Sequence, residues 1–192
     1  STDSEYYQNI AIKNGALAPF LRPEEISRDS STDYEMVKHL LDWLGKNKKV
    51  PDYLVHIRPT SPMRDPEIID KAILRFSKEK DSTSLRSIHL MSESAYKTFE
   101  MANNGYLKPI FSKTTDLDIS NKPRQSFPDT YAANGYVDVL SCDFINEKKC
   151  LHGDKVIPYL TPKIAEIDSE DDFVYLNYLI EQNPNLFKKL FE

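Results

Sequence analysis

Cationic side chains in loops are the residues of this chain that most directly suggest chemistry. Arg58 and Arg64 flank the hydroxyls of Thr60 and Ser61 in a short segment that contains two prolines. Arginine makes bidentate hydrogen bonds to carboxylate and phosphate groups, so several loop arginines indicate an anionic ligand. Taken singly, each one is explained as simply by a solvated charge or a structural ion pair. Other loops add Arg22, Lys97 and Arg124.

Two carboxylates, Glu166 and Asp168, flank Ile167 where the sequence predicts the end of a strand. Alternation along a strand would put both on the same side, where they could hold Mg²⁺, an ion that shares oxygen ligands with water and substrate phosphates. The alternative is that Asp168 or Ser169 caps the following helix, since acidic residues are favoured at that end. The sequence leaves both interpretations open.

The sequence gives no support for covalent catalysis. The histidines do not occur at any metal-ligand or triad spacing, and no Gly-x-Ser-x-Gly or Cys–His arrangement offers a nucleophile. The glycines are also widely spaced, so no glycine-rich loop is present to hold phosphates through backbone N–H groups. They are Gly15, Gly45, Gly105, Gly135 and Gly153.

Length and composition indicate one ordinary globular domain. The chain has 192 residues and a net charge of −5, which argues against a nucleic-acid or anionic-membrane binder. No apolar run approaches the roughly 18 residues of a membrane span. Cys142 and Cys150 form no metal-type pair or disulfide framework, so we expect a cytoplasmic protein with a core thiol or surface thiols.

Hydrophobic patterns predict alternating strands and helices, and hence a parallel sheet with helices on its faces. The loop after the strand that contains Leu54, Val55 and Ile57 leads into a helix with Asp65 as N-cap and Pro66 as its first residue. Ligands of open α/β sheets bind at such strand ends. The predicted strands cover 16–21, 54–57, 85–91, 136–140 and 156–160, with a hairpin over 96–101 and 106–111 and an Asn134-Gly135 turn. Helices are predicted over 5–14, from residue 33 with an apolar face that extends to Leu44, and over 66–80. A further helix is predicted from residue 169, and a short one after Pro184. In the helix from 169 the inward side chains are Phe173, Leu176, Leu179 and Ile180.

Several motifs, in order and at matching spacing, resemble those of acylneuraminate cytidylyltransferases, the CMP-sialic acid synthetases. They are the segments 1–5, 20–25, 59–64, 97–98, 123–125, 134–135 and 167–173. The resemblance covers essentially the whole chain. It implies a Rossmann-like nucleotidyltransferase fold, with residues 1–192 as a single domain and an excursion at about 95–133 for dimerisation and substrate binding. It also implies a cytoplasmic homodimer that couples CTP to an acidic nine-carbon 2-keto sugar and releases pyrophosphate with Mg²⁺.

The same resemblance assigns roles to residues. It places Arg22, Thr60, Ser61, Arg64 and Asn134 at the nucleotide, with part of that loop also lining the sugar. It makes Lys97 and Arg124 a cationic pair that meets the sugar carboxylate or the phosphates, partly across the dimer. Glu166 and Asp168 correspond to the metal carboxylates, and Asp168 is also linked to the anomeric hydroxyl. That hydroxyl would attack the α-phosphorus of CTP in line.

The chain departs from the family pattern at several positions. Members carry Gln where this chain has Arg58, often Arg at Ala132, often Tyr at Asp138 and usually Asp at Glu166. Arg58 and Asp138 are therefore expected at the sugar, whose identity stays open among sialic, legionaminic, pseudaminic and other nonulosonic acids. The family's Pro-Ala-Arg-Gly-Gly-Ser-Lys loop is not found in these residues, so we expect them to be a partial sequence or inactive alone. The alternatives are a truncated, non-catalytic dimerising module, or an enzyme for another keto-acid sugar.

Overall fold

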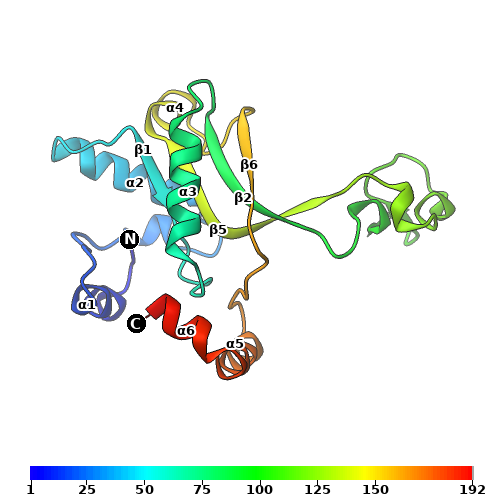
Figure 1. Ribbon diagram of the computed structural model, residues 1–192. Coiled ribbons are helices and arrows are strands. Elements are labelled where there is room, and N and C mark those ends of the chain that lie inside the picture. Colours follow the sequence, from blue (N-terminus) through cyan, green and yellow to red (C-terminus); the bar gives the residue numbers. More distant parts are fainter. Residues whose placement is uncertain (192) are drawn as a thin grey trace. The chain divides into compact units, whose positions relative to one another are not determined.

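Helices and strands alternate along the chain in the computed structural model, which describes residues 1–191 (Figure 1). The helices are α1 (Glu5–Lys13), α2 (Asp33–Lys46), α3 (Pro66–Ser77), α4 (Cys142–Lys148), α5 (Glu170–Gln182) and α6 (Pro184–Phe191). Short 3-10 helices are η1 (Glu24–Ile26), η2 (Ala95–Lys97), η3 (Leu117–Ser120) and η4 (Arg124–Ser126). The strands are β1 (Tyr53–His56), β2 (Ser84–Leu90), β3 (Phe99–Met101), β4 (Leu107–Pro109), β5 (Tyr131–Ser141) and β6 (Val156–Leu160).

Four strands form the main sheet, in the order β1-β5-β2-β6. Strand β5 runs antiparallel to β1. Strands β2 and β6 run in the same direction, because Thr83 donates to the carbonyl of Lys155 at one end and Thr161 donates to that of Ile88 at the other. No described helix, among residues 1–191, is long and apolar enough to cross a bilayer. The α/β architecture is thus confirmed, with β2 and β6 parallel as predicted, whereas β1 and β5 pair in the antiparallel direction that the alternating pattern does not predict.

The chain divides into two compact units, and the expected single domain stays a prediction. Unit 1 comprises Ser1–His56, Ala72–Leu85 and Asp138–Ile157. Its core is a cluster of fully or almost fully buried side chains from α2, β5 and α4, namely Val37, Leu41, Leu140, Cys142 and Ile145. Burial raises the pKa of the Cys142 thiol to about 11, so this cysteine is a neutral packing group, as expected.

Helix α2 supplies one face of that core because its sequence specifies both its start and its apolar face. The Thr32 hydroxyl accepts a hydrogen bond from the backbone of Glu35, whose carboxylate in turn accepts from the backbone of Thr32. Val37 and Leu41 are four residues apart, so they project from the same side of the helix into the core. The predicted helix is confirmed.

Unit 2 comprises Ile57–Lys71, Arg86–Val137 and the segment from Pro158 onward. Helices α5 and α6 contact each other in this unit, and α6 is also tied to the start of α3. The tie is an ion pair in which Lys189 Nζ lies 2.7 Å from Asp65 Oδ2. Asp65 also accepts a hydrogen bond from the backbone of Glu67 at 3.0 Å, so it caps α3 as predicted.

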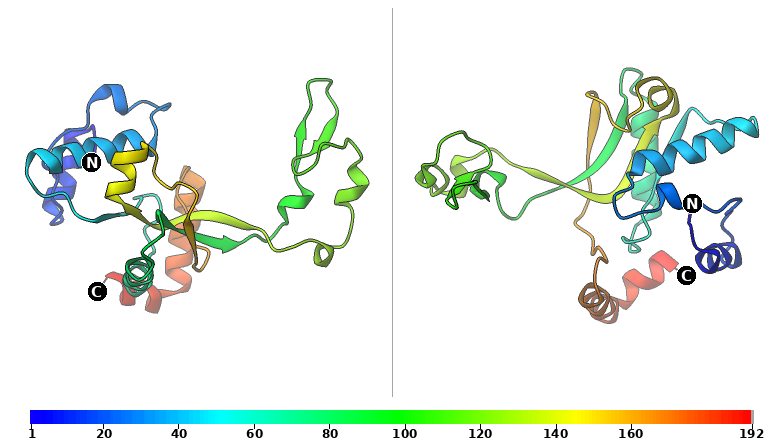
Figure 2. Two further views of the ribbon diagram at one scale, coloured as in Figure 1. Left: turned by 90° about the horizontal axis from the view of Figure 1, so that it is seen from above. Right: turned by 180° about the vertical axis from the view of Figure 1, so that it is seen from behind.

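Residues 95–130 of unit 2 form an arm built on a small hairpin (Figure 2). Strands β3 and β4 are antiparallel, with Phe99 opposite Pro109. The Tyr96 ring packs edge-on to Phe111 and lies stacked on Phe127 with centroids 5.5 Å apart. The predicted hairpin is confirmed with shorter strands, because Tyr96 belongs to η2. The use of this arm for dimerisation stays a prediction.

Two predicted features of the backbone are wrong. Residues 16–21 are not a strand, because Pro19 offers no N–H donor and only Leu21 forms an isolated bridge, to Thr2. Asn134-Gly135 is not a turn but lies inside β5, where Gly135 adopts φ +60°. Glycine allows this conformation at no steric cost, so the strand passes through the position without reversing.

The strand end was also placed wrongly by the sequence pattern. Strand β6 ends at Leu160, so Glu166 and Asp168 lie in an irregular segment and strand alternation does not apply to them. Two side chains that were expected inward are exposed: Ile57 is 44% exposed and Phe173 is 50% exposed. Ile57 directly follows the last residue of β1, and Phe173 lies in the first turn of α5, so both are close to the end of an element.

The Lys189–Asp65 ion pair makes the attachment of α6 dependent on pH. The hydrogen bond from Lys189, and then that from the Glu67 backbone, lower the pKa of Asp65 below its ordinary 3.8. A lowered carboxyl pKa stabilises the fold above 3.8, and this stabilisation is lost as the pH falls through the folded pKa. We expect Lys189→Ala to speed amide exchange in α6 at pH 7, and the difference from wild type to shrink as the pH falls below 3.8 and to disappear once the pH is below the lowered pKa of Asp65. Lys189→Arg should retain the protection, and equal exchange in all three proteins at pH 7 would contradict the tie.

Candidate functional site

Loop 57–65 of unit 2 joins β1 to α3 and carries most of the predicted nucleotide-binding residues. Its conformation is held by Arg64, whose guanidinium donates to the carbonyl of Arg58 in the same loop and to that of Gly135 in β5, the latter at 3.0 Å. Burial lowers the pKa of Arg64 from its usual value, yet the group stays cationic at neutral pH. Arg64 therefore braces the loop against β5.

Gly135 is the point at which the predicted site residues meet. A Cβ atom at this position would lie 3.3 Å from Glu166 Oε1, 3.5 Å from Ser61 Oγ and 3.8 Å from Arg58 Cδ. The absence of a side chain thus leaves a small space over which a carboxylate, a hydroxyl and an arginine stem converge. Ser61 is fully buried, and among the described residues its Oγ has no hydrogen-bond partner. A buried hydroxyl without a partner indicates room for a water molecule or a ligand atom.

Asn134, predicted at the nucleotide, precedes this glycine and is 5% exposed. Its Nδ2 donates to Thr161 Oγ1 at 2.6 Å, and its Oδ1 accepts from the backbone of Tyr136 at 3.3 Å. The amide therefore joins β5 to the segment after β6. Sequence reasoning missed Thr161 and Tyr136, although a polar residue directly after a strand and an aromatic residue directly after a glycine were the available signals.

The structure separates the two interpretations of the acidic segment. Ser169 is the N-cap of α5, and its hydroxyl accepts from the backbone of Asp172, whose carboxylate accepts from the backbone of Ser169. The Ser169 hydroxyl is the main cause that lowers the pKa of Asp172. Asp168 takes part in this capping only through its backbone N–H, so its exposed carboxylate is not used by the cap.

The acidic segment is also attached to loop 57–65. The backbone N–H of Ile167 donates to the carbonyl of Thr60 at 2.8 Å, which carries Glu166 and Asp168 alongside the loop. Within residues 1–191, no group of three or more His, Cys, Asp or Glu side chains could hold a metal ion. Glu166 Oε1 borders the space over Gly135 together with the partnerless Ser61 hydroxyl, and Asp168 follows two residues later. These residues suit an ion such as Mg²⁺, which commonly uses one or two protein carboxylates and takes its other ligands from water and phosphates.

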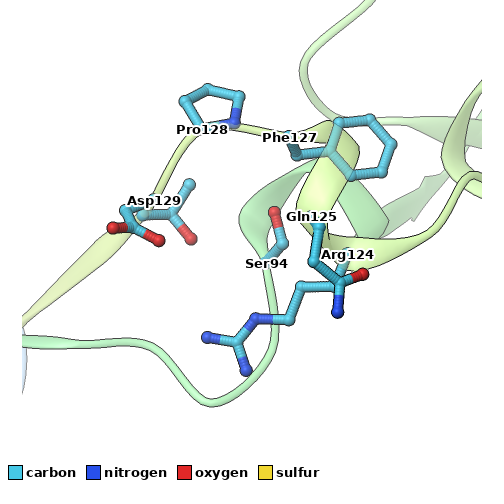
Figure 3. Close-up of a pocket in the computed structure, with 7 residues that line it drawn as sticks. Ser94, Arg124, Gln125, Phe127, Pro128 and Asp129 are labelled. Carbon is cyan, nitrogen blue, oxygen red and sulfur yellow. The ribbon is translucent and has the colours of Figure 1, made fainter.

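Arg124 lies on the arm, in a pocket of about 310 Å³ (Figure 3). One of its terminal nitrogens donates to the carbonyl of Met91 at 2.9 Å. The other lining residues are Ser94, Gln125, Phe127, Pro128, Asp129 and Thr130. Lys97, in η2 of the same arm, is not among them, so the structure does not gather the predicted cationic pair in this pocket. The hydroxyl and carboxylate groups of this pocket were not anticipated from the sequence.

Two predicted site residues, Arg22 and Asp138, belong to unit 1. Arg22 pairs with Asp3 at 3.5 Å and donates through Nε to Ser27 Oγ at 2.9 Å. Asp138 lies in β5 opposite His56 of β1 and is only 2% exposed. Arg22 is thus fixed by local hydrogen bonds, whereas Asp138 is a buried residue of the sheet.

Comparison with known proteins shows what this chain is similar to. A family model described as Cytidylyltransferase matches residues 1–167. The chain is 27% identical over 190 residues to a CMP-N,N'-diacetyllegionaminic acid synthase of Legionella pneumophila, covering 95% of this chain and 77% of that protein. It is also 27% identical over 190 residues to an N-acylneuraminate cytidylyltransferase of Escherichia coli, covering 96% of this chain. It spans only 42% of the length of that second relative.

A solved structure gives the same fold. The chain superposes on the structure of a CMP:2-keto-3-deoxy-manno-octonic acid synthetase complexed with CTP with a TM-score of 0.61, covering 95% of this chain and 79% of that one. The sequence identity is 10%, so this likeness concerns the fold alone, and it confirms the predicted nucleotidyltransferase α/β class. With the family model matching residues 1–167, the predicted family is confirmed as well: the chain belongs to the cytidylyltransferase family.

Proposed function

We propose that this chain forms the catalytic part of a CMP-nonulosonate synthetase. The reaction transfers CMP from CTP to the anomeric hydroxyl of a sialic-acid-like 2-keto acid sugar and releases pyrophosphate. The observation that carries the proposal is the convergence of Ser61, Arg58 and Glu166 over Gly135, in a chain whose family model covers that whole site. The names of its relatives include sialic and legionaminic acid enzymes, which suggests this substrate class.

The charges of the site suit these substrates. CTP and the sugar carboxylate are both anionic, and Arg58 and Arg124 offer guanidinium groups that bind phosphate and carboxylate oxygens in pairs. Arg64 contributes differently, because its hydrogen bonds to backbone carbonyls hold the loop that carries Thr60 and Ser61. Arg58 and Arg124 are thus proposed to bind the substrates, whereas Arg64 holds the loop in place. Lys97 and Arg22 are proposed to add positive charge at the sugar and at the cytidine.

The chemistry requires mainly placement and charge neutralisation. In an in-line transfer at the α-phosphorus the protein holds the attacking hydroxyl opposite the leaving pyrophosphate, and little covalent work is needed. Glu166 and Asp168 would hold Mg²⁺, which when bound neutralises phosphate charge and favours ionisation of a nearby hydroxyl. Asp168, whose carboxylate is not used by the helix cap, is proposed to orient the anomeric hydroxyl.

The arm supports the proposal of a homodimer. Its hairpin exposes large apolar side chains: Met101 is 75% exposed, Tyr106 73% and Ile110 58%. A cluster of this kind on a short hairpin is characteristic of an interaction surface, and a second copy of the chain would bury it. We propose that the enzyme works as a cytoplasmic homodimer through this arm.

One observation favours a second candidate substrate. The solved structure with the same fold is named for an eight-carbon keto-acid sugar, 2-keto-3-deoxy-manno-octonic acid. Arg58, which departs from the sialic acid pattern and lies near Gly135, is proposed to contribute to the choice of sugar. An enzyme for another keto-acid sugar is therefore the alternative that the substrate assay must separate.

The purified protein that carries this chain should release pyrophosphate from CTP only when a 2-keto acid sugar is present. We would test sialic, legionaminic, pseudaminic and 3-deoxy-manno-octulosonic acids in parallel. Asp168→Asn should lower turnover by at least about a hundredfold, because the attacking hydroxyl loses its orienting carboxylate. Asp171→Asn, one turn away on α5, is the matched control and should retain wild-type turnover. The proposal would be refuted if none of these sugars led to release of pyrophosphate, or if the Asp168→Asn variant were active.

Removal of divalent cations with EDTA should abolish turnover, and added Mg²⁺ should restore it. Glu166→Gln keeps the shape of the side chain but removes one anionic oxygen ligand, so the Mg²⁺ concentration for half-maximal activity should rise about tenfold. Glu170→Gln, on the first turn of α5, should leave that concentration unchanged. Full activity in EDTA would remove the metal from the mechanism.

Ile110→Lys should convert the dimer to a monomer, because it places a charge in the apolar surface of the arm. The dissociation constant from sedimentation equilibrium should rise at least about thirtyfold. Leu17→Lys alters an equally apolar exposed residue, 95% exposed in unit 1, and should not affect association. A wild-type protein that sediments as a monomer would contradict the proposed dimer.

A further inference from the structure

Tyr136 is a buried tyrosine next to the site whose hydroxyl has a specific partner. The residue lies in β5 directly after Gly135 and is 2% exposed. Its hydroxyl oxygen accepts a hydrogen bond from the backbone N–H of Asp65 at 2.6 Å. Asp65 is the last residue of the loop that carries Thr60 and Ser61, and it caps α3. The tyrosine thus reaches from β5 to the point where the loop becomes a helix.

Two consecutive residues of β5 hold this end of the loop. The carbonyl of Gly135 accepts from the Arg64 guanidinium at 3.0 Å, and the hydroxyl of Tyr136 accepts from Asp65. Because Arg64 and Asp65 are adjacent, their two ties fix both the position and the direction of the backbone there. The rest of the loop, including the buried Ser61 beside Gly135, is placed relative to that fixed end.

The hydrogen bond from Asp65 is hard to replace. An N–H group that loses its partner in a partly buried place costs free energy, and the first N–H groups of a helix have no partners within the helix. Burial is the main cause that raises the pKa of Tyr136, so its hydroxyl stays neutral at physiological pH and keeps both a proton and acceptor lone pairs. Lys189, paired with Asp65, adds a second attachment at the same residue.

We propose that Tyr136 is a positioning residue, which holds loop 57–65 in the conformation that brings Ser61 and Arg58 over Gly135. Tyr136 acts through the loop rather than on the reacting atoms. The inference rests on the proposed function for its effect on activity, while its effect on the loop is a property of the fold alone. Its loss should weaken the binding of substrates that the loop lines and leave the carboxylate chemistry in place.

Tyr136→Phe is the direct test, since it removes only the hydroxyl oxygen. Tyr159→Phe is the matched control: Tyr159 also lies in unit 2 and its hydroxyl also bonds a backbone group, the carbonyl of Ile68 within α3, at 3.4 Å. We expect Tyr136→Phe to speed exchange of the Asp65 amide about tenfold and to raise KM for CTP by a similar factor, with a smaller change in kcat. Tyr159→Phe should leave the Asp65 amide and KM as in wild type.

The outcomes separate the positioning role from the proposed function. If the wild-type protein is active and Tyr136→Phe keeps its KM and its Asp65 exchange, the positioning role is overturned. Equal effects of the two substitutions would also overturn it, because a general loss of stability would then explain both. If no sugar supports turnover, the proposed function fails, yet the exchange measurement still decides whether Tyr136 holds the loop. If Tyr136→Phe does not fold, exchange of the Asp65 amide is measured in the wild-type protein alone. Exchange at the unprotected rate would overturn the inference, and slowed exchange would support it.

Discussion

The backbone conformation of Gly135 is the constraint on which the site of unit 2 depends. With φ at +60° in the middle of β5, this residue turns its carbonyl to the Arg64 guanidinium and leaves the space of a side chain open. That space is bounded by Glu166, Ser61 and Arg58. Any side chain at this position would adopt a strained conformation and push against a carboxylate oxygen at 3.3 Å. The strand thus serves as a scaffold and as the floor of the site.

Hydrogen bonds hold the segments that surround this floor. Loop 57–65 is tied to β5 through Arg64, and the acidic segment is tied to the loop through Ile167 and Thr60. Asn134 joins β5 to Thr161 at the start of that segment. These polar groups are partly or fully buried, where each hydrogen bond is worth more than at an exposed surface and each unpaired group costs more. These hydrogen bonds therefore join segments that are far apart in the sequence.

Sequence patterns predicted the regular elements well because those patterns have local causes. The Asp65-Pro66 helix start and the cap at Ser169 were predicted, and both depend on residues within one turn. The predicted start of α2 near residue 33 likewise has a local cause, the capping box that the structure shows between Thr32 and Glu35. The hairpin of the arm followed from its glycine-containing loop. The family, the fold class and the residues around Gly135 were likewise accessible from motifs and their spacing.

The errors arose where long-range contacts decide the local structure. Asn-Gly is a strong turn signal, yet the Asn134 side chain bonds to Thr161, 27 residues away, and keeps the segment within a strand. Residues 16–21 have the apolar character of a strand, but their β-pairing is limited to the isolated bridge between Leu21 and Thr2. The bond between Tyr136 and Asp65 joins residues 71 positions apart, so no window of the sequence contains it. The hydrophobic periodicity of a segment indicates the secondary structure that it favours locally, and contacts between residues far apart in the sequence override that preference.

Two departures from the family pattern, Arg58 and Glu166, become related once Gly135 is considered. Arg58 Cδ and Glu166 Oε1 both lie within 3.8 Å of the same missing Cβ position, so their side chains share one limited space. They also act in opposite directions on one neighbour, because Arg58 lowers and Glu166 raises the pKa of Arg64. A glutamate is one methylene longer than the usual aspartate, and an arginine carries a charge that the usual glutamine lacks. Arg58 thus adds a positive charge beside Glu166, whereas the exchange of aspartate for glutamate changes the reach of the carboxylate and not its charge. Both departures therefore alter the same space at the floor of the site, one through its charge and the other through its size.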